Sequence, residues 1–111
     1  MDNIKEDRYY IAKVVENIDL IISYTKDLSY IDFIDNLIVI DAVMFRLIQM
    51  VENISHISNN YKMLHSEIRW GQIAGFRNGI VHNYGRVDYS IVYEIISKDI
   101  YNLKKVLELT V

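Results

Sequence analysis

The chain of 111 residues contains no cysteine and no proline, and its four glycines all lie between residues 71 and 85. Without cysteine, neither a disulfide nor a thiolate metal site can form. Without proline, and without glycine before residue 71, little interrupts a long helix. No segment alternates apolar and polar residues over the length of a strand. These absences predict an all-α protein, organised as one small domain over residues 1–111.

The sequence also lacks an apolar signal core at its charged N-terminus, and polar residues interrupt its most apolar run at roughly helical intervals. We therefore expect a cytoplasmic protein that makes no membrane contact. A formal net charge of -3 argues against duplex DNA as a partner. Residues 68–87, however, contain Arg69, Arg77 and Arg86 and no acidic residue, which predicts a local positive field.

Apolar residues make up 51% of the chain, which is more than a small domain hides easily. A buried interface with a second copy or with another partner is the simplest explanation. The alternative is an ordinary surface that is rich in tyrosine. Of the two, we favour self-association as a homodimer.

The apolar pattern predicts four helices, joined as an antiparallel up-down four-helix bundle. The first helix has an apolar stripe of Ile11, Val15, Ile18 and Ile22, widened by Val14 and Ile21. The second allows a break near Asp35 and Asn36. Residues 58–62 are predicted to be a loop. The predicted ranges are 3–27, 30–57, 66 to at least 82, and 89–109, with Asn3, Ser29 and Asp88 as caps of the first, second and fourth.

Three of the glycines, Gly71, Gly75 and Gly79, are spaced four apart on the third predicted helix. Each costs about 1 kcal/mol relative to alanine inside a helix, so close packing of another helix is the expected compensation. That helix could be the second helix of the same chain or belong to a second copy. The alternative is an interrupted helix with a loop near residues 71–75.

The stretch RNGIVHNY at residues 77–84 carries the chemistry of the sequence. Asn78 and His82 share a helix face, whereas Arg77 and His82 point about 140° apart on a regular helix. They can converge only if the helix ends or distorts between them, or if two copies meet. Histidine can move protons near neutral pH, and arginine can stabilise charge on a phosphate. Together they suffice for RNA cleavage without a metal, with Asn78 in support and Tyr84 offering a phenol.

A structural interpretation competes with this one, because a lone histidine near a helix end is often a cap or a satisfied, partly buried residue. His56 and His65 make no metal-binding spacing with His82, and no acid-rich cluster is present, so we expect no metal site and no cofactor. The glycine spacing does not match a phosphate-binding loop.

The motif RN-x3-H-x-Y, formed by Arg77, Asn78, His82 and Tyr84, resembles the signature of the HEPN superfamily, and specifically of the HepT-like ribonuclease toxins. Similarity extends over WGQIAGFRNGIVHNYGRVDYSIVYEII and, more loosely, over DAVMFRLIQMVENISHIS. The chain departs from that pattern at Val51 and Asn53, where relatives often carry small residues beside a glutamate, and it ends soon after the fourth helix.

The resemblance implies a helical HEPN-like homodimer whose two motifs face each other across a composite cleft. It implies a metal-independent endoribonuclease that acts as the toxin of a toxin–antitoxin pair, with a small nucleotidyltransferase as the cognate antitoxin. By the same resemblance, Arg77 and His82 are catalytic, Asn78 supports them, and Tyr84 is a site for attachment of AMP. Two alternatives stay open: a non-catalytic module that binds a nucleotide or the nucleotidyltransferase, and a structural helical dimer with an inert motif.

Overall fold

The computed structural model describes the backbone of residues 3–83 and 87–110, and the side chains of residues 6–76 and 87–110. This part of the chain is helical and contains no strand, so the predicted all-α fold is confirmed. The helices are α1 (Asn3–Thr25), α2 (Tyr30–Ile34), α3 (Leu37–Ser55), α4 (Asn59–Leu64), α5 (Trp70–Asn83), α6 (Tyr89–Glu94) and α7 (Ile100–Glu108), and a π-helical turn, η2 (Ile95–Asp99), joins the last two.

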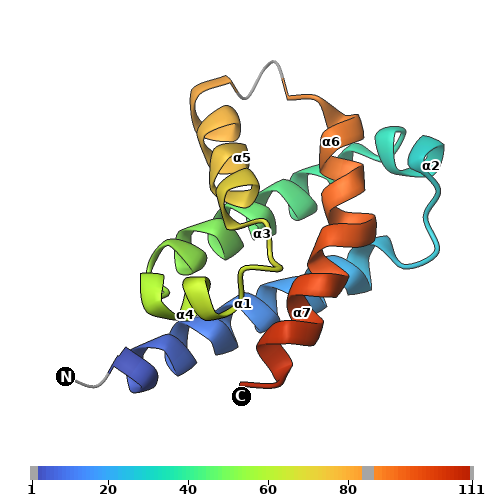
Figure 1. Ribbon diagram of the computed structural model, residues 1–111. Helices are drawn as coiled ribbons and strands as arrows, with labels where there is room; N and C mark the ends of the chain where they lie inside the picture. Colours follow the sequence, from blue (N-terminus) through green and yellow to red (C-terminus); the bar gives the residue numbers. More distant parts are fainter. Residues whose placement is uncertain (1–2, 84–86, 111) are drawn as a thin grey trace.

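The first and second predicted helices pack as an antiparallel pair, α1 beside α3 (Figure 1). Helix α5 packs against α3, and α7 packs against α1. The continuous run of α6, η2 and α7 descends steeply beside that pair in Figure 1, so the long helices are not all aligned along one axis. The short helix α2 is the part of the second predicted helix that precedes its predicted break, whereas α4 is an addition to the four predicted elements.

The core is built mainly from the inner faces of α1, α3 and the α6–α7 run. In the fourth predicted helix, spacing of three and four residues predicts one apolar stripe, and all five of its members are buried: Val92, Ile96, Ile100, Leu103 and Leu107. On α1 the buried stripe is Ile11, Val14, Ile18 and Ile21. The prediction placed Val15 and Ile22 at the centre of the stripe and Val14 and Ile21 at its edge, which was wrong. Val14 and Ile21 are buried, whereas Val15 and Ile22 are only half-buried.

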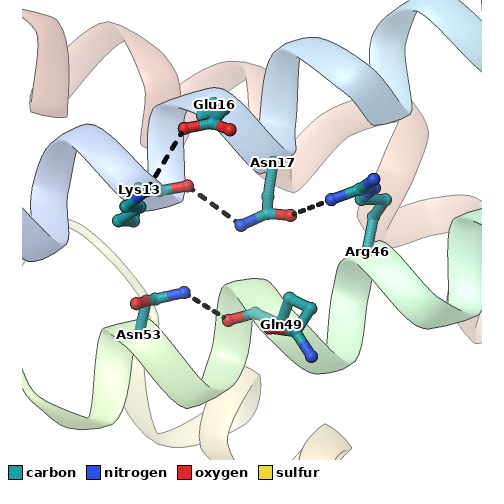
Figure 2. A network of polar contacts seen from close by, with 6 residues as sticks. All are labelled: Lys13, Glu16, Asn17, Arg46, Gln49 and Asn53. Carbon is teal, nitrogen blue, oxygen red and sulfur yellow. Dashed lines mark hydrogen bonds and ion pairs between the residues drawn. The ribbon is translucent and has the colours of Figure 1, made fainter.

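A polar contact closes one edge of the α1–α3 interface (Figure 2). Asn17 is 6% exposed, and its Nδ2 donates to the carbonyl oxygen of Lys13 at 2.9 Å. Its Oδ1 accepts from Nη1 of Arg46 on α3 at 3.4 Å. A buried amide is thus satisfied from both helices, which offsets the cost of removing it from water.

The helix ends follow the predicted caps in most places. The Ser29 hydroxyl accepts from the Asp32 amide at 3.1 Å, and Asn36 accepts from the Val39 amide at 3.1 Å. The predicted break near Asp35 and Asn36 is therefore confirmed, with Asn36 as the cap that starts α3. Helix α1 ends at Thr25 rather than at residue 27, and Asp27 takes a positive φ of 65° just beyond it.

The prediction of a loop at residues 58–62 was wrong, because this stretch forms the start of α4. The carboxylate of Asp7, itself 6% exposed, accepts from the Ser58 amide at 2.9 Å and from the Ser58 hydroxyl at 2.7 Å. The Ser58 hydroxyl also caps the helix by accepting from the Tyr61 amide. Burial raises the pKa of Tyr61, whose hydroxyl is hydrogen-bonded to Thr110.

Candidate functional site

The motif occupies the second half of α5. Arg77, Asn78 and His82 all lie within its helical backbone, and the helix ends at Asn83. The prediction that the helix reaches at least His82 is confirmed, but it begins at Trp70 and not near Ser66. The side chains of Arg77, Asn78 and His82 lie outside the described part of the structure, as does Tyr84 as a whole.

The backbone is α-helical from Arg77 through His82. One of the two routes by which these residues could converge was a helix that ended or distorted between them, and the continuous helix excludes it. Five residues on a regular helix separate the two positions by about 140°. The backbone of one copy therefore places the two positions on different faces of α5, and of the two predicted routes to convergence the meeting of two copies is the one left.

Trp70 fixes the first turn of α5. Its indole Nε1 donates to the carbonyl oxygens of Lys62 and His65, at 3.1 and 3.0 Å. The ring meets Tyr61 edge-on, and Ile73, one turn later, is 7% exposed. These contacts replace the first turn predicted at residues 66–69, where the chain instead makes a tight connection. The role of Trp70 was missed, although the only tryptophan of the chain, placed just before the motif, was a signal for it.

Arg69 does not add a free positive charge to the motif. Its guanidinium makes an ion pair with Asp99 at the end of η2, at 2.5 Å, and this contact raises its pKa further. Arg69 therefore contributes less to the predicted positive field of the three arginines, because Asp99 neutralises its charge. The small cavity beside this pair, about 50 Å³ and lined also by Ile68, Ile73 and Ile95, holds little more than water and cannot admit a nucleotide.

Gly71 and Gly75 of α5 do not pack against the described part of the chain. A methyl group added at Gly71 or Gly75 would meet no atom within 4 Å, and both residues are exposed. The expectation of close approach by the second helix of the same chain was wrong at these two positions. The alternative of a loop near 71–75 was also wrong, because both lie within α5. Gly79 is beyond the described side chains.

The helix face that carries the two exposed glycines also carries two positions of the motif. Positions 71, 75, 78 and 82 fall within a sector of about 60° on a helix, so Asn78 and His82 lie on the same face as the two exposed glycines. Position 77 instead lies one turn beyond the buried Ile73, on the side of α5 that packs inward. Helix α5 thus carries its histidine position on the face of the two exposed glycines and its arginine position on a different face.

Helix α6 follows the motif along the chain, and Asp88 caps its start. Asp88 accepts from the Ser90 amide at 2.9 Å, which confirms its predicted role as the cap. Hydrogen bonds from the Ser90 hydroxyl and amide lower the pKa of the Asp88 carboxyl. The helix that carries the motif thus starts at an anchored tryptophan, and the next helix along the chain starts at an aspartate cap.

Comparison with known proteins gives one family and several relatives. The family model described as Ribonuclease HepT-like matches residues 14–110. A protein of Methanocaldococcus jannaschii named "Putative RNase MJ1380" is 27% identical over 95% of this chain and 96% of its own length. A protein of Thermococcus cleftensis named "Probable ribonuclease HepT" is 32% identical over 86% of each chain. No solved structure matches. Within the described residues no helix is long and apolar enough to cross a membrane.

Proposed function

Because the chain belongs to the HepT-like ribonuclease family, we propose that it is a metal-independent endoribonuclease whose active site forms between two copies. The observation that carries the proposal is the unbroken helix through Arg77 and His82, beside an open face that carries Gly71 and Gly75. The continuous helix separates the two catalytic positions within one copy. The open face leaves room for the α5 of another.

The proposed reaction is attack of a ribose 2′-hydroxyl on the adjacent phosphorus. The bond from O2′ to phosphorus forms while the bond from phosphorus to O5′ breaks, which leaves a cyclic phosphate and a free 5′-hydroxyl. His82 takes the proton from the 2′-hydroxyl and supplies one to the leaving O5′. Arg77 stabilises the charge that develops on the phosphate oxygens, and Asn78 orients His82 or the substrate.

As a further part of the proposal, the enzyme acts as a toxin that a small nucleotidyltransferase antitoxin restrains. Tyr84 is the position at which AMP would be attached. Its place in the motif, one residue beyond the end of α5, supports this assignment. An adenylate there would add a phosphate and a base beside the His82 position, and both its charge and its bulk would oppose entry of RNA.

The direct test is incubation of purified protein with total RNA and with tRNA in EDTA. Wild-type protein should cleave, and His82→Ala and Arg77→Ala should each lose at least about a hundredfold in rate, the ordinary contribution of a general acid–base group for the first and of a group that stabilises transition-state charge for the second. Full activity of His82→Ala would refute the mechanism. Absence of cleavage by wild-type protein, together with thermal stabilisation by ATP or AMP, would instead favour a non-catalytic nucleotide-binding module.

A mixing experiment tests the two-copy site. Arg77→Ala and His82→Ala chains are inactive alone, but a mixed dimer would pair an intact arginine from one copy with an intact histidine from the other. Co-refolded at equal amounts, they should regain about a quarter of wild-type activity, since half the dimers are mixed and each holds one intact site of two. A site contained within one copy would regain nothing. A mixture of Arg77→Ala with itself is the control.

A further inference from the structure

Helix α2 and the first turn of α3 expose a cluster of large apolar side chains. Five of nine consecutive residues have relative exposures between 38% and 82%. We name them the α2 patch: Tyr30, Ile31, Ile34, Leu37 and Ile38. Single exposed apolar residues need no explanation, but a cluster of this density is typical of a surface that another molecule covers.

The α2 patch is held in a fixed shape although a five-residue helix is not stable alone. Phe33, on the inner side of α2, is fully buried. The Tyr93 hydroxyl on α6 donates to the carbonyl oxygen of Leu28 at 2.7 Å, and its ring packs near Tyr30 and Phe33. Because the scaffold uses its own contacts to fix α2, a partner would bind without first ordering it.

Between Lys26 and Arg46, the stretch that holds the α2 patch carries charge of one sign along the chain. Residues 27–45 contain four aspartates and no lysine, arginine or histidine. Helix α6, which packs beside α2 (Figure 1), adds Asp88 and Glu94 and no basic residue over residues 87–94. Lys26 and Arg46 are the nearest basic residues along the chain, and Arg46 is hydrogen-bonded to Asn17.

These acidic residues beside the patch exclude several kinds of molecule that could otherwise cover it. RNA and anionic lipid surfaces are repelled by them. A second copy joined by a two-fold axis through the patch would place the same aspartates opposite each other. A protein with an apolar surface ringed by lysine or arginine is complementary in both respects.

We propose that the α2 patch is the docking surface for a protein partner whose apolar contact is ringed by basic residues. The α2 patch belongs to α2 and α3, whereas the motif belongs to α5, and α2 packs against α3 and α6. The proposal does not depend on whether the chain cleaves RNA.

The test uses two labelled helical peptides with the same leucine face, one with lysine and one with glutamate on the polar face. Fluorescence anisotropy should give at least about tenfold tighter binding of the lysine peptide to wild-type protein. Ile31→Gln with Ile38→Gln should weaken that binding at least about tenfold. The matched control, Met63→Gln with Leu109→Gln, alters two equally exposed apolar residues elsewhere and should bind as wild type.

Charge is tested by Asp35→Lys with Asp41→Lys, which should abolish the preference for the lysine peptide. Equal binding of both peptides to wild-type protein would overturn the proposal, as would binding unaffected by the Ile31 and Ile38 substitutions. Sedimentation of Ile31→Gln with Ile38→Gln tests whether a second copy covers the patch instead. A loss of self-association in that variant would show that it does, and would overturn the proposal. Circular dichroism confirms folding, and Ile38→Gln alone, at the most exposed position, replaces the double variant if that one does not fold.

Discussion

Gly75 gives the sharpest test of how α5 is used, because the isolated chain and the proposed dimer predict opposite effects there. In a single copy, Gly75 is exposed inside a helix, and an added methyl group would touch nothing within 4 Å. Replacement by alanine then gains the helix propensity of alanine without a steric cost. Gly75→Ala should raise the free energy of unfolding of the monomer by about 1 kcal/mol.

The assay is urea unfolding followed by circular dichroism at protein concentrations below those at which the chain self-associates. A gain of about 1 kcal/mol moves the midpoint upward by roughly 0.5 M, given the denaturant dependence of a small domain. A destabilised Gly75→Ala monomer would refute the placement of this residue on an open face of α5.

The larger change, Gly75→Leu, tests the dimer. The leucine has room in the single copy, so the variant should fold with nearly wild-type stability. Against a second helix approaching the glycine face it would collide, because close approach depends on the absence of a side chain. We expect at least a tenfold weaker dimer, about 1.4 kcal/mol, and a parallel loss of RNA cleavage.

Ala12→Leu is the matched control, since it adds the same bulk to an exposed small residue on α1. It should leave self-association unchanged, as measured by sedimentation equilibrium. If Gly75→Leu dimerises as tightly as wild type, the partner does not sit on the glycine face, and the inference from the open face to the two-copy site fails with it.

Two further predictions concern Trp70 at the start of α5 and Asp88 at the start of α6. Trp70→Phe keeps an aromatic ring but removes the Nε1 donor to two carbonyl oxygens. The free energy of unfolding, measured in urea by circular dichroism, should fall by about 1 kcal/mol. An unchanged midpoint would show that these bonds do not anchor α5. The lowered pKa of Asp88 means that its contribution to stability is present above its ordinary pKa and is lost as pH falls through the lowered value. The protection factor of the Ser90 amide should therefore drop on acidification in wild-type protein but not in Asp88→Asn, which keeps a capping oxygen that does not titrate; equal behaviour of the two would contradict it.

Features that depend on neighbouring residues could be predicted well from sequence. The caps at Ser29 and Asp88 and the stripe of the fourth helix follow from local hydrogen bonding and a period of 3.6 residues. The break before α3 was visible for the same reason, because Asn36 is both a poor interior residue and a good cap.

Features that depend on distant residues could not. The sequence around Ser58 and Tyr61 has the composition of a loop. It becomes helical because Asp7, on α1 and 51 positions away, accepts hydrogen bonds from the Ser58 amide and hydroxyl. The pairing of Arg69 with Asp99 is likewise a contact across thirty positions. Periodicity carries no information about either.

The motif itself shows the same division. Its residue types, its helical backbone and the separation of Arg77 from His82 follow from spacing, and the continuous helix confirms the last two. What spacing could not supply is the open face, since glycines four apart fit equally well under a neighbouring helix of the same chain. That distinction came from the empty space around Gly71 and Gly75.

The glycine face of α5 and the α2 patch differ in whether they can pack against the same surface of a second copy. Gly71 and Gly75 carry no side chain, and α5 holds no acidic residue between Trp70 and Asn83, so this face can meet the same face of a second copy across a two-fold axis without repulsion between carboxylates. The α2 patch cannot do so without opposing its aspartates. Dimerisation through α5 would therefore leave both α2 patches uncovered, one on each copy. A dimer that cleaves RNA between its α5 helices can then hold two basic protein partners at once, and the activity should fall on dilution with the dissociation of the dimer, whether or not those partners are bound.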